Sequence, residues 1–246
     1  MMQPSNPSEE TPETAATSKT PARSAATSAA NSAANSAAVL SGASVGRLSL
    51  YYRELHRLRD SESTNVNSQE LGRLVDVSPA VVRRDLSALG TIGRRGVGYE
   101  VETLIESIGQ VLGSGKKWKV VLVGVGSLGD ALLRYRGFER LGFRLVAAYD
   151  SDPRKIGAVV ADVPIYDAET MEQSLRSERP ELAILAVPSE NAIEIAATLV
   201  RCQIHGILNF APTTLKLPGN VAVVNVDLAS ELQRLVFAVQ TQHQKT

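Results

Sequence analysis

From residue 119 onward, short apolar runs alternate with helix-like stretches, and this alternation constrains the fold more than any other feature. The runs are VVLVGVG, FRLVAAYD, ELAILAV, GILNF and VAVVNV. They are continuously apolar and do not alternate with polar residues as half-exposed strands do. Strands of this kind belong to parallel sheets that carry helices on both faces. The sequence therefore predicts an α/β fold with a doubly wound parallel sheet of the Rossmann type.

The first apolar run leads into a glycine-rich turn that opens a helix-like stretch. In a GxGxxG turn the first glycine allows a tight bend and the second lets backbone approach a pyrophosphate. The third lets the helix pack close to the strand. An acid at the end of the next strand, about 20 residues on, accepts hydrogen bonds from the adenosine ribose. The sequence predicts an NAD(H) site made by Gly124, Val125, Gly126, Ser127, Leu128, Gly129 and Asp150.

Val187 and Pro188 directly follow the apolar run ILAV. In a doubly wound sheet the ligand binds at the carboxyl ends of the strands. We therefore expect Val187 and Pro188 to line the nicotinamide side of the site.

The histidines do not favour a dehydrogenase. Hydride transfer needs an acid–base group near the nicotinamide, often His, and a region that grips the substrate. His56 lies in the N-terminal helical part, His205 just before a strand and His243 in the terminal tail. Only one further helix, predicted at 227–242, follows the sheet. We expect no catalytic residue and no enzyme activity, with the nucleotide acting as a signal; an NAD-dependent oxidoreductase with a fused helical regulatory domain is the alternative.

Residues 45–112 follow a different pattern, in which apolar side chains recur at spacings of three and four. The predicted helices cover 45–60, 67–77 and 78–90. A segment of glycines and arginines, 91–99, comes next and suits a hairpin loop. Three short helices followed by such a loop is the order of a winged helix-turn-helix, with the helix-turn-helix at about 50–89.

The third predicted helix and the loop carry several arginines and one acidic residue, Asp85. The net charge of the whole chain is zero. A local basic excess of this kind favours an anionic partner. A recognition helix reads base edges with its N-terminal half, while arginines hold phosphates. A solvated packing unit is the alternative. We predict double-stranded DNA as the partner, contacted by Ser78, Arg83, Arg84, Ser87, Arg94 and Arg95.

The sequence divides into five segments. Residues 1–44 are rich in Ala, Ser and Thr and are predicted to be disordered, with a transit peptide as the less favoured interpretation. A winged-helix domain is expected at 45–112, a linker at 113–118, a Rossmann domain at 119–226, and a C-terminal helix with its tail at 227–246.

Cysteine content and hydropathy indicate the compartment. The single cysteine, Cys202, excludes an intrachain disulfide and a multi-cysteine metal site, and a thiol sensor stays open. No apolar run approaches the roughly 18 residues of a membrane span. We expect a cytoplasmic protein with no metal and no membrane contact.

A series of short segments occurs in one order between residue 45 and about residue 240: RLSLYYREL, SPAVVRRDLSALG, RRGVGY, VGVGSLGDALL, YDSDPRKIG, ILAVPS, GILNFAP and VNVDLASEL. Together they resemble the redox-sensing transcriptional repressors of the Rex family. The resemblance implies a homodimer that exchanges its final helix between subunits. It also implies a repressor that binds operator DNA and releases it when NADH rises relative to NAD⁺.

The resemblance further implies a switch among three residues of this chain. Asp227 would come from the exchanged helix of the partner and alternate between Arg53 and Tyr135. Unrelated polar interface groups are the alternative for these three. For the whole chain, a nucleotide- or CoA-binding regulator that contacts protein is a third interpretation.

Overall fold

The computed structural model describes residues 40–91, 93, 94 and 96–243, which form two compact units divided between Gly113 and Ser114. The predicted linker 113–118 falls at this division. Residues 1–39 of the predicted disordered segment lie outside the described residues. The first described helix begins at Gly42, so residues 42–44, which were expected to be disordered, are helical.

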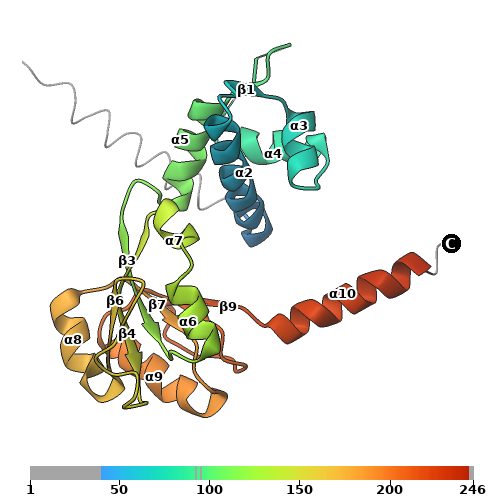
Figure 1. The fold of residues 1–246 in the computed structure, drawn as a ribbon. Coiled ribbons are helices and arrows are strands. Elements are labelled where there is room, and N and C mark those ends of the chain that lie inside the picture. Colours follow the sequence, from blue (N-terminus) through green and yellow to red (C-terminus); the bar gives the residue numbers. More distant parts are fainter. Residues whose placement is uncertain (1–39, 92, 95, 244–246) are drawn as a thin grey trace, which may run out of the picture. The chain divides into compact units, whose positions relative to one another are not determined.

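The first unit contains four helices among its described residues (Figure 1). These are α2 (Gly42–Asp60), α3 (Ser68–Leu74), α4 (Pro79–Ala88) and α5 (Val101–Leu112), with strands β1 (Asn65–Val66) and β2 (Tyr99–Glu100). Asn67 and Ser78 cap α3 and α4, because each side chain accepts hydrogen bonds from backbone N–H groups of the following turn. The sequence pattern placed α2, α3 and α4 but did not separate α5.

Apolar faces of these helices form one core. Leu48, Tyr51 and Leu55 of α2 are fully buried and belong to the same cluster as Leu104 and Ile108 of α5. In the loop predicted as a wing, residues 94 and 98 form a bridge, and β2 at its end pairs antiparallel with β1. The unit therefore has the winged helix-turn-helix order expected from the sequence.

The second unit is a seven-stranded sheet in the order β5-β6-β4-β3-β7-β8-β9. Its strands are β3 (Trp118–Val123), β4 (Phe143–Asp150), β5 (Val159–Val160), β6 (Val163–Asp167), β7 (Leu182–Leu185), β8 (Gly206–Asn209) and β9 (Ala222–Asn225). All neighbours are parallel except the short hairpin β5–β6. From β6 to β9 the order is the 3-2-1-4-5-6 order of a Rossmann sheet.

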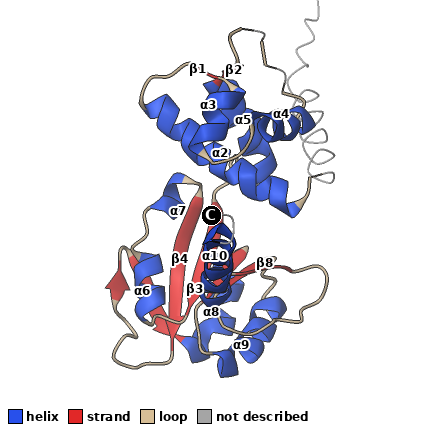
Figure 2. Cartoon of the chain, turned by 90° about the vertical axis from the view of Figure 1, so that its right-hand side faces the viewer, coloured by secondary structure: helices blue, strands red, loops and turns tan. Residues whose placement is uncertain are grey.

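Helices cover both faces of this sheet (Figures 1 and 2). They are α6 (Ser127–Leu133), α7 (Gly137–Arg140), α8 (Met171–Glu178, preceded by the 3-10 turn η1, Ala168–Thr170), and α9 (Ser189–Arg201). Val120 and Leu122 of β3 belong to the core on the side of α6 and α7, whereas Val121 and Val123 belong to the core on the side of α8 and α9. This two-sided burial explains why the strand is continuously apolar, and it confirms the predicted fold class.

The last helix, α10 (Leu228–His243), follows β9. Its apolar side chains are exposed in the single chain: Leu228, Leu232, Leu235, Val236, Phe237 and Val239. An apolar helix face of this length is normally buried against a partner surface.

Candidate functional site

The glycine turn lies where the strand order reverses, between β3 and β7. Gly124 has φ = +94°, in the left-handed region that favours glycine. A side chain at residue 124 would collide with the carbonyl oxygen of Ala186 and lie 2.8 Å from a methyl group of Val187. The turn can therefore pass close to the end of β7 only because residue 124 is glycine.

The other two glycines have different surroundings. A Cβ at Gly129 would collide with the carbonyl oxygen of Gly124, so the start of α6 packs directly on the turn. A Cβ at Gly126 would meet nothing within 4 Å, and Gly126 has an ordinary extended backbone with φ = −74°. The first and third glycines are thus required by the protein's own packing. The second is the position at which backbone faces open space, where a pyrophosphate would approach.

Asp150 ends β4 beside this turn and organises it. Its Oδ2 atom accepts hydrogen bonds from the Val125 N–H (2.7 Å) and from Lys155 Nζ (3.2 Å), and its Oδ1 atom accepts from the Asp152 N–H (2.8 Å). A carboxylate has about four acceptor positions, so one on Oδ1 stays open for a ligand hydroxyl. Lys155 is a contact that the sequence pattern did not predict.

The charge state of Asp150 suits this role. Burial raises the pKa of the carboxyl group, but the backbone hydrogen bonds from Asp152 and Val125 and the Lys155 ammonium outweigh it and hold the pKa below its usual value. Asp150 is therefore an ionised acceptor at neutral pH. An ionised carboxylate with an open acceptor position can accept a hydrogen bond from a ribose hydroxyl. The residues at this turn therefore fit NAD(H).

Val187 and Pro188 follow β7 at the same edge of the sheet. Val187 is half-buried and packs beside Gly124, while Pro188 is exposed and precedes α9 as its N-cap residue. The structure thus brings Val187 to the turn, next to the point where the sheet reverses. Their contact with a nicotinamide stays a prediction.

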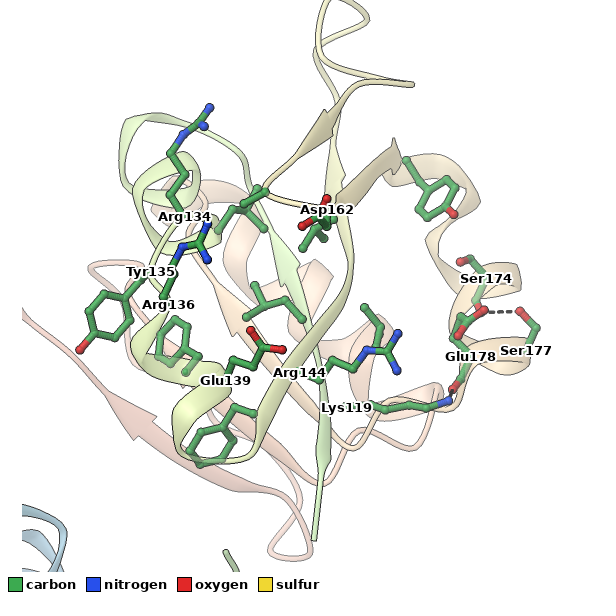
Figure 3. Close-up of a pocket in the computed structure, with 18 of the residues that line it drawn as sticks. Lys119, Arg134, Tyr135, Arg136, Glu139, Arg144, Asp162, Ser174, Ser177 and Glu178 are labelled. Atoms are coloured by element: carbon green, nitrogen blue, oxygen red, sulfur yellow. Dashed lines mark hydrogen bonds between the residues drawn. The ribbon is translucent and has the colours of Figure 1, made fainter. Parts of the chain in front are cut away.

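A cavity of about 1110 Å³ lies elsewhere in this unit (Figure 3). Its wall includes Lys119, which lies at the beginning of β3. The glycine turn follows the other end of the same strand. Its charged groups are mixed, with Lys119 and Arg144 beside Glu139, Asp162 and Glu178. The cavity is separate from the turn, and neither the turn nor Asp150 lines it.

The candidate DNA-binding face is the exposed side of α4. Ala80, Arg83, Arg84 and Ser87 are all exposed and lie three or four residues apart, so they form one stripe along the helix. Arg83 Nη1 donates to Ser68 Oγ of α3 at 3.0 Å. Ser78 is occupied as the N-cap of α4, through the Val81 N–H.

The acid among these arginines is not on that stripe. Asp85 is 2% exposed and forms an ion pair with Arg47 of α2. The exposed face of α4 is therefore more basic than its sequence suggests. In the wing, Arg94 bridges to Gly98, and Arg95 lies outside the described residues.

The three residues of the implied switch each have local partners. Arg53 Nε binds Glu54 Oε1 at 3.0 Å. Tyr135 is 59% exposed, packs edge-on against Phe138, and points outward at the rim of the cavity (Figure 3). Asp227 caps α10, accepting hydrogen bonds from the N–H groups of Ala229 and Ser230 and from Ser230 Oγ. Their mutual contact stays a prediction.

Cys202 follows α9 and is buried. Burial raises the pKa of its thiol, and Glu172 adds to the effect. Oxidant-sensing cysteines are exposed thiolates with a lowered pKa. The surroundings of Cys202 are those of a packing residue.

Two family models match the chain, one in each unit. A family described as "Putative DNA-binding protein N-terminus" matches residues 40–87, and one described as "CoA binding domain" matches residues 115–213. Within the described part of the chain, no helix is both long and apolar enough to cross a membrane.

Curated relatives match most of the chain. A redox-sensing transcriptional repressor Rex of Rhodopirellula baltica is 61% identical over 203 residues, which are 82% of this chain and 86% of the relative. Another Rex, of Desulforamulus reducens, is 42% identical over 79% of this chain and 93% of its own.

Solved structures of a Rex-family repressor, RSP, have the same architecture. RSP in complex with β-NAD⁺ and operator DNA has a TM-score of 0.77 at 33% identity, covering 84% of this chain and 95% of RSP. RSP in complex with β-NADH has a TM-score of 0.74 at 32% identity, covering 84% and 97%.

Proposed function

This chain belongs to the Rex family of redox-sensing transcriptional repressors, and we propose that it binds operator DNA and releases it when NADH rises relative to NAD⁺. The observation that carries the proposal is a glycine turn with an ionised acid at the reversal point of a Rossmann sheet, in the same chain as a winged helix with an arginine stripe. RSP, which shares this architecture, has been solved with NAD⁺ and operator DNA and with NADH. We also propose a cytoplasmic location, because an operator-binding protein needs access to the chromosome.

Each residue of the nucleotide site would have a distinct task. Gly126 lets backbone approach the pyrophosphate, and Asp150 accepts a ribose hydroxyl on Oδ1. The oxidised nicotinamide ring is cationic and the reduced ring is neutral. Burying a cation against apolar atoms costs desolvation energy, so an aliphatic wall at Val187 would favour the reduced ring.

On the DNA side, Arg83 and Arg84 of α4 would enter the major groove, together with Ser87 of the same stripe and Ser78 at the N-cap of the helix. Arg94 and Arg95 of the wing would reach the backbone or the adjacent groove. Phosphate contacts made by these arginines would make affinity depend on salt.

A homodimer is part of the proposal. The apolar face of α10 has no cover in the single chain, and exchange with a second copy would bury it. In that dimer, Asp227 of the partner would alternate between Arg53 and Tyr135 and so relate the nucleotide state to the position of the DNA-binding units.

We further propose that the chain has no enzyme activity. The RSP and Rex relatives are named as transcriptional repressors. Turnover of NADH with a small carbonyl compound would instead favour the oxidoreductase alternative.

The test is fluorescence anisotropy of a labelled operator duplex from the protein's own or a neighbouring promoter. Protein is titrated at fixed salt with no nucleotide, NAD⁺, NADH or CoA. We expect binding to weaken with NADH alone. Binding that ignores both forms of the dinucleotide contradicts the proposal, and release by CoA would assign the site to a different ligand.

A further inference from the structure

Asp85 directly follows two arginines in the sequence, yet its side chain is buried in the first unit. It is 2% exposed, whereas its neighbours Arg83 and Arg84 are exposed. A carboxylate is rarely buried to this extent unless it is paired. The position on α4 makes its partners informative, because α4 carries the arginine stripe.

Three donors on α2 hold this carboxylate. Arg47 makes a two-bond fork, with Nε 2.6 Å from Oδ2 and Nη2 2.8 Å from Oδ1. The Tyr51 hydroxyl donates to Oδ2 at 3.2 Å, and Arg47 Nη2 also donates to Ser44 Oγ at 3.1 Å. Ser44, Arg47 and Tyr51 lie three and four residues apart, so they share one face of α2. A fork of this kind fixes direction as well as distance.

The protonation states agree with this geometry. Burial raises the pKa of Asp85, but the hydrogen bond and charge of Arg47 outweigh it, and the pKa lies below its usual value. Burial, together with the charge of Asp85, raises the pKa of Tyr51 to about 12. At neutral pH the carboxylate is ionised and the phenol keeps its proton, so both can make the bonds described.

The other core-facing contacts of α4 are apolar and less directional, and its hydrogen bond from Arg83 to Ser68 of α3 lies on the exposed side. Val82 and Leu86 are fully buried in the same core. Apolar contacts resist separation of two helices more than they resist a small rotation. The fork at Asp85 therefore supplies the directional constraint on the opposite side of α4 from the stripe.

We propose that Arg47 and Asp85 are a positioning pair for DNA recognition: they set the rotation of α4 about its own axis and so aim Arg83 and Arg84 at the major groove. The inference rests on the proposed function, since it needs α4 to be the recognition helix. To read the DNA sequence, each side chain must lie at a particular base edge. Attraction between arginines and phosphates tolerates small rotations of the helix. The pair should therefore govern the preference for operator over other DNA.

The test is Arg47→Lys, measured by anisotropy on an operator duplex and on an unrelated duplex of equal length, at one salt concentration. Lysine keeps the charge that Asp85 needs, but a point-charge ammonium cannot make the fork. We expect operator affinity to fall about tenfold or more, with affinity for unrelated DNA and its salt slope unchanged. Arg59→Lys is the matched control: it lies on the same helix, and its ion pair with Asp60 is exposed.

Two results would overturn the proposal. Unchanged affinity for both duplexes would leave the pair with a packing role only, and an equal fall on both duplexes would show a general loss of structure. Thermal unfolding and NADH binding report whether the variant is folded. If Arg47→Lys does not fold, Tyr51→Phe removes one bond to Asp85 with little change in shape, and the same ratio must fall, though less. Failure of the wild type to bind operator would be a separate result that contradicts the proposed function instead.

Discussion

At the scale of single residues, the three glycines of the turn differ in what depends on them. Gly124 and Gly129 are needed by the chain itself, because a side chain at either would strike backbone oxygen. Gly126 faces open space and has a φ that any residue adopts. The motif assigned a tight bend to the first glycine, ligand approach to the second and helix packing to the third, and the surroundings of Gly124 and Gly129 agree with the roles given to them.

This difference predicts opposite results for two matched variants. Gly129→Ala should lower the free energy of unfolding by about 1–3 kcal/mol, since the added methyl group overpacks the turn. Gly126→Ala should change stability by less than about 0.5 kcal/mol but weaken NADH binding. Urea unfolding and calorimetric NADH titration measure the two effects. Normal NADH affinity in Gly126→Ala would mean that the pyrophosphate does not approach this backbone.

Asp85 shows a limit of sequence patterns at this scale. The two residues before it, Arg83 and Arg84, are exposed, so the sequence suggests that Asp85 is a surface charge as well. Whether a charged residue in a short helix faces out or in depends on a partner far along the chain, here Arg47. No local pattern contains that partner.

At the scale of elements, the sequence predicted the strands that form apolar runs and missed the hairpin β5–β6. Strands β3, β4 and β7 are mainly apolar because both faces of the sheet are covered, and such apolar runs can be recognised in a sequence. The hairpin β5–β6 escaped prediction because β5 has two residues and β6 contains Pro164. The glycine-rich turn was expected to open one helical stretch, and the structure has two helices there, α6 and α7, with residues 134–136 between them.

The apolar face of helix α10 leads to a prediction about dimer formation. Leu232 lies in the row of apolar residues that the single chain leaves exposed. Leu232→Glu should leave the fold of each subunit intact and convert the proposed dimer to monomer, because helix exchange would bury the row against a second copy. Sedimentation equilibrium measures this, with Gln233→Glu as a control of equal charge change outside the row. A wild type that is monomeric at micromolar concentration would contradict helix exchange.

At the scale of the molecule, the sequence predicted the winged helix, the Rossmann sheet and their order. Each of the two folds has a repeating pattern of apolar residues that can be recognised in a short stretch of sequence. Of the residues implied for the switch, Arg53 belongs to the first unit and Tyr135 and Asp227 to the second, and in the single chain each has its own local partner. A contact that forms between subunits leaves no periodicity in one chain. Family resemblance, not spacing, indicated those three.

The central claim is that the nucleotide site and the DNA-binding face are coupled in one molecule, and coupling between two binding sites is reciprocal. The most direct test is the NADH dissociation constant measured by calorimetry, with and without saturating operator duplex, at one salt concentration. The account predicts that operator weakens NADH binding by the same factor by which NADH weakens operator binding, and that a scrambled duplex has no such effect. Equal NADH affinity with and without operator would contradict it.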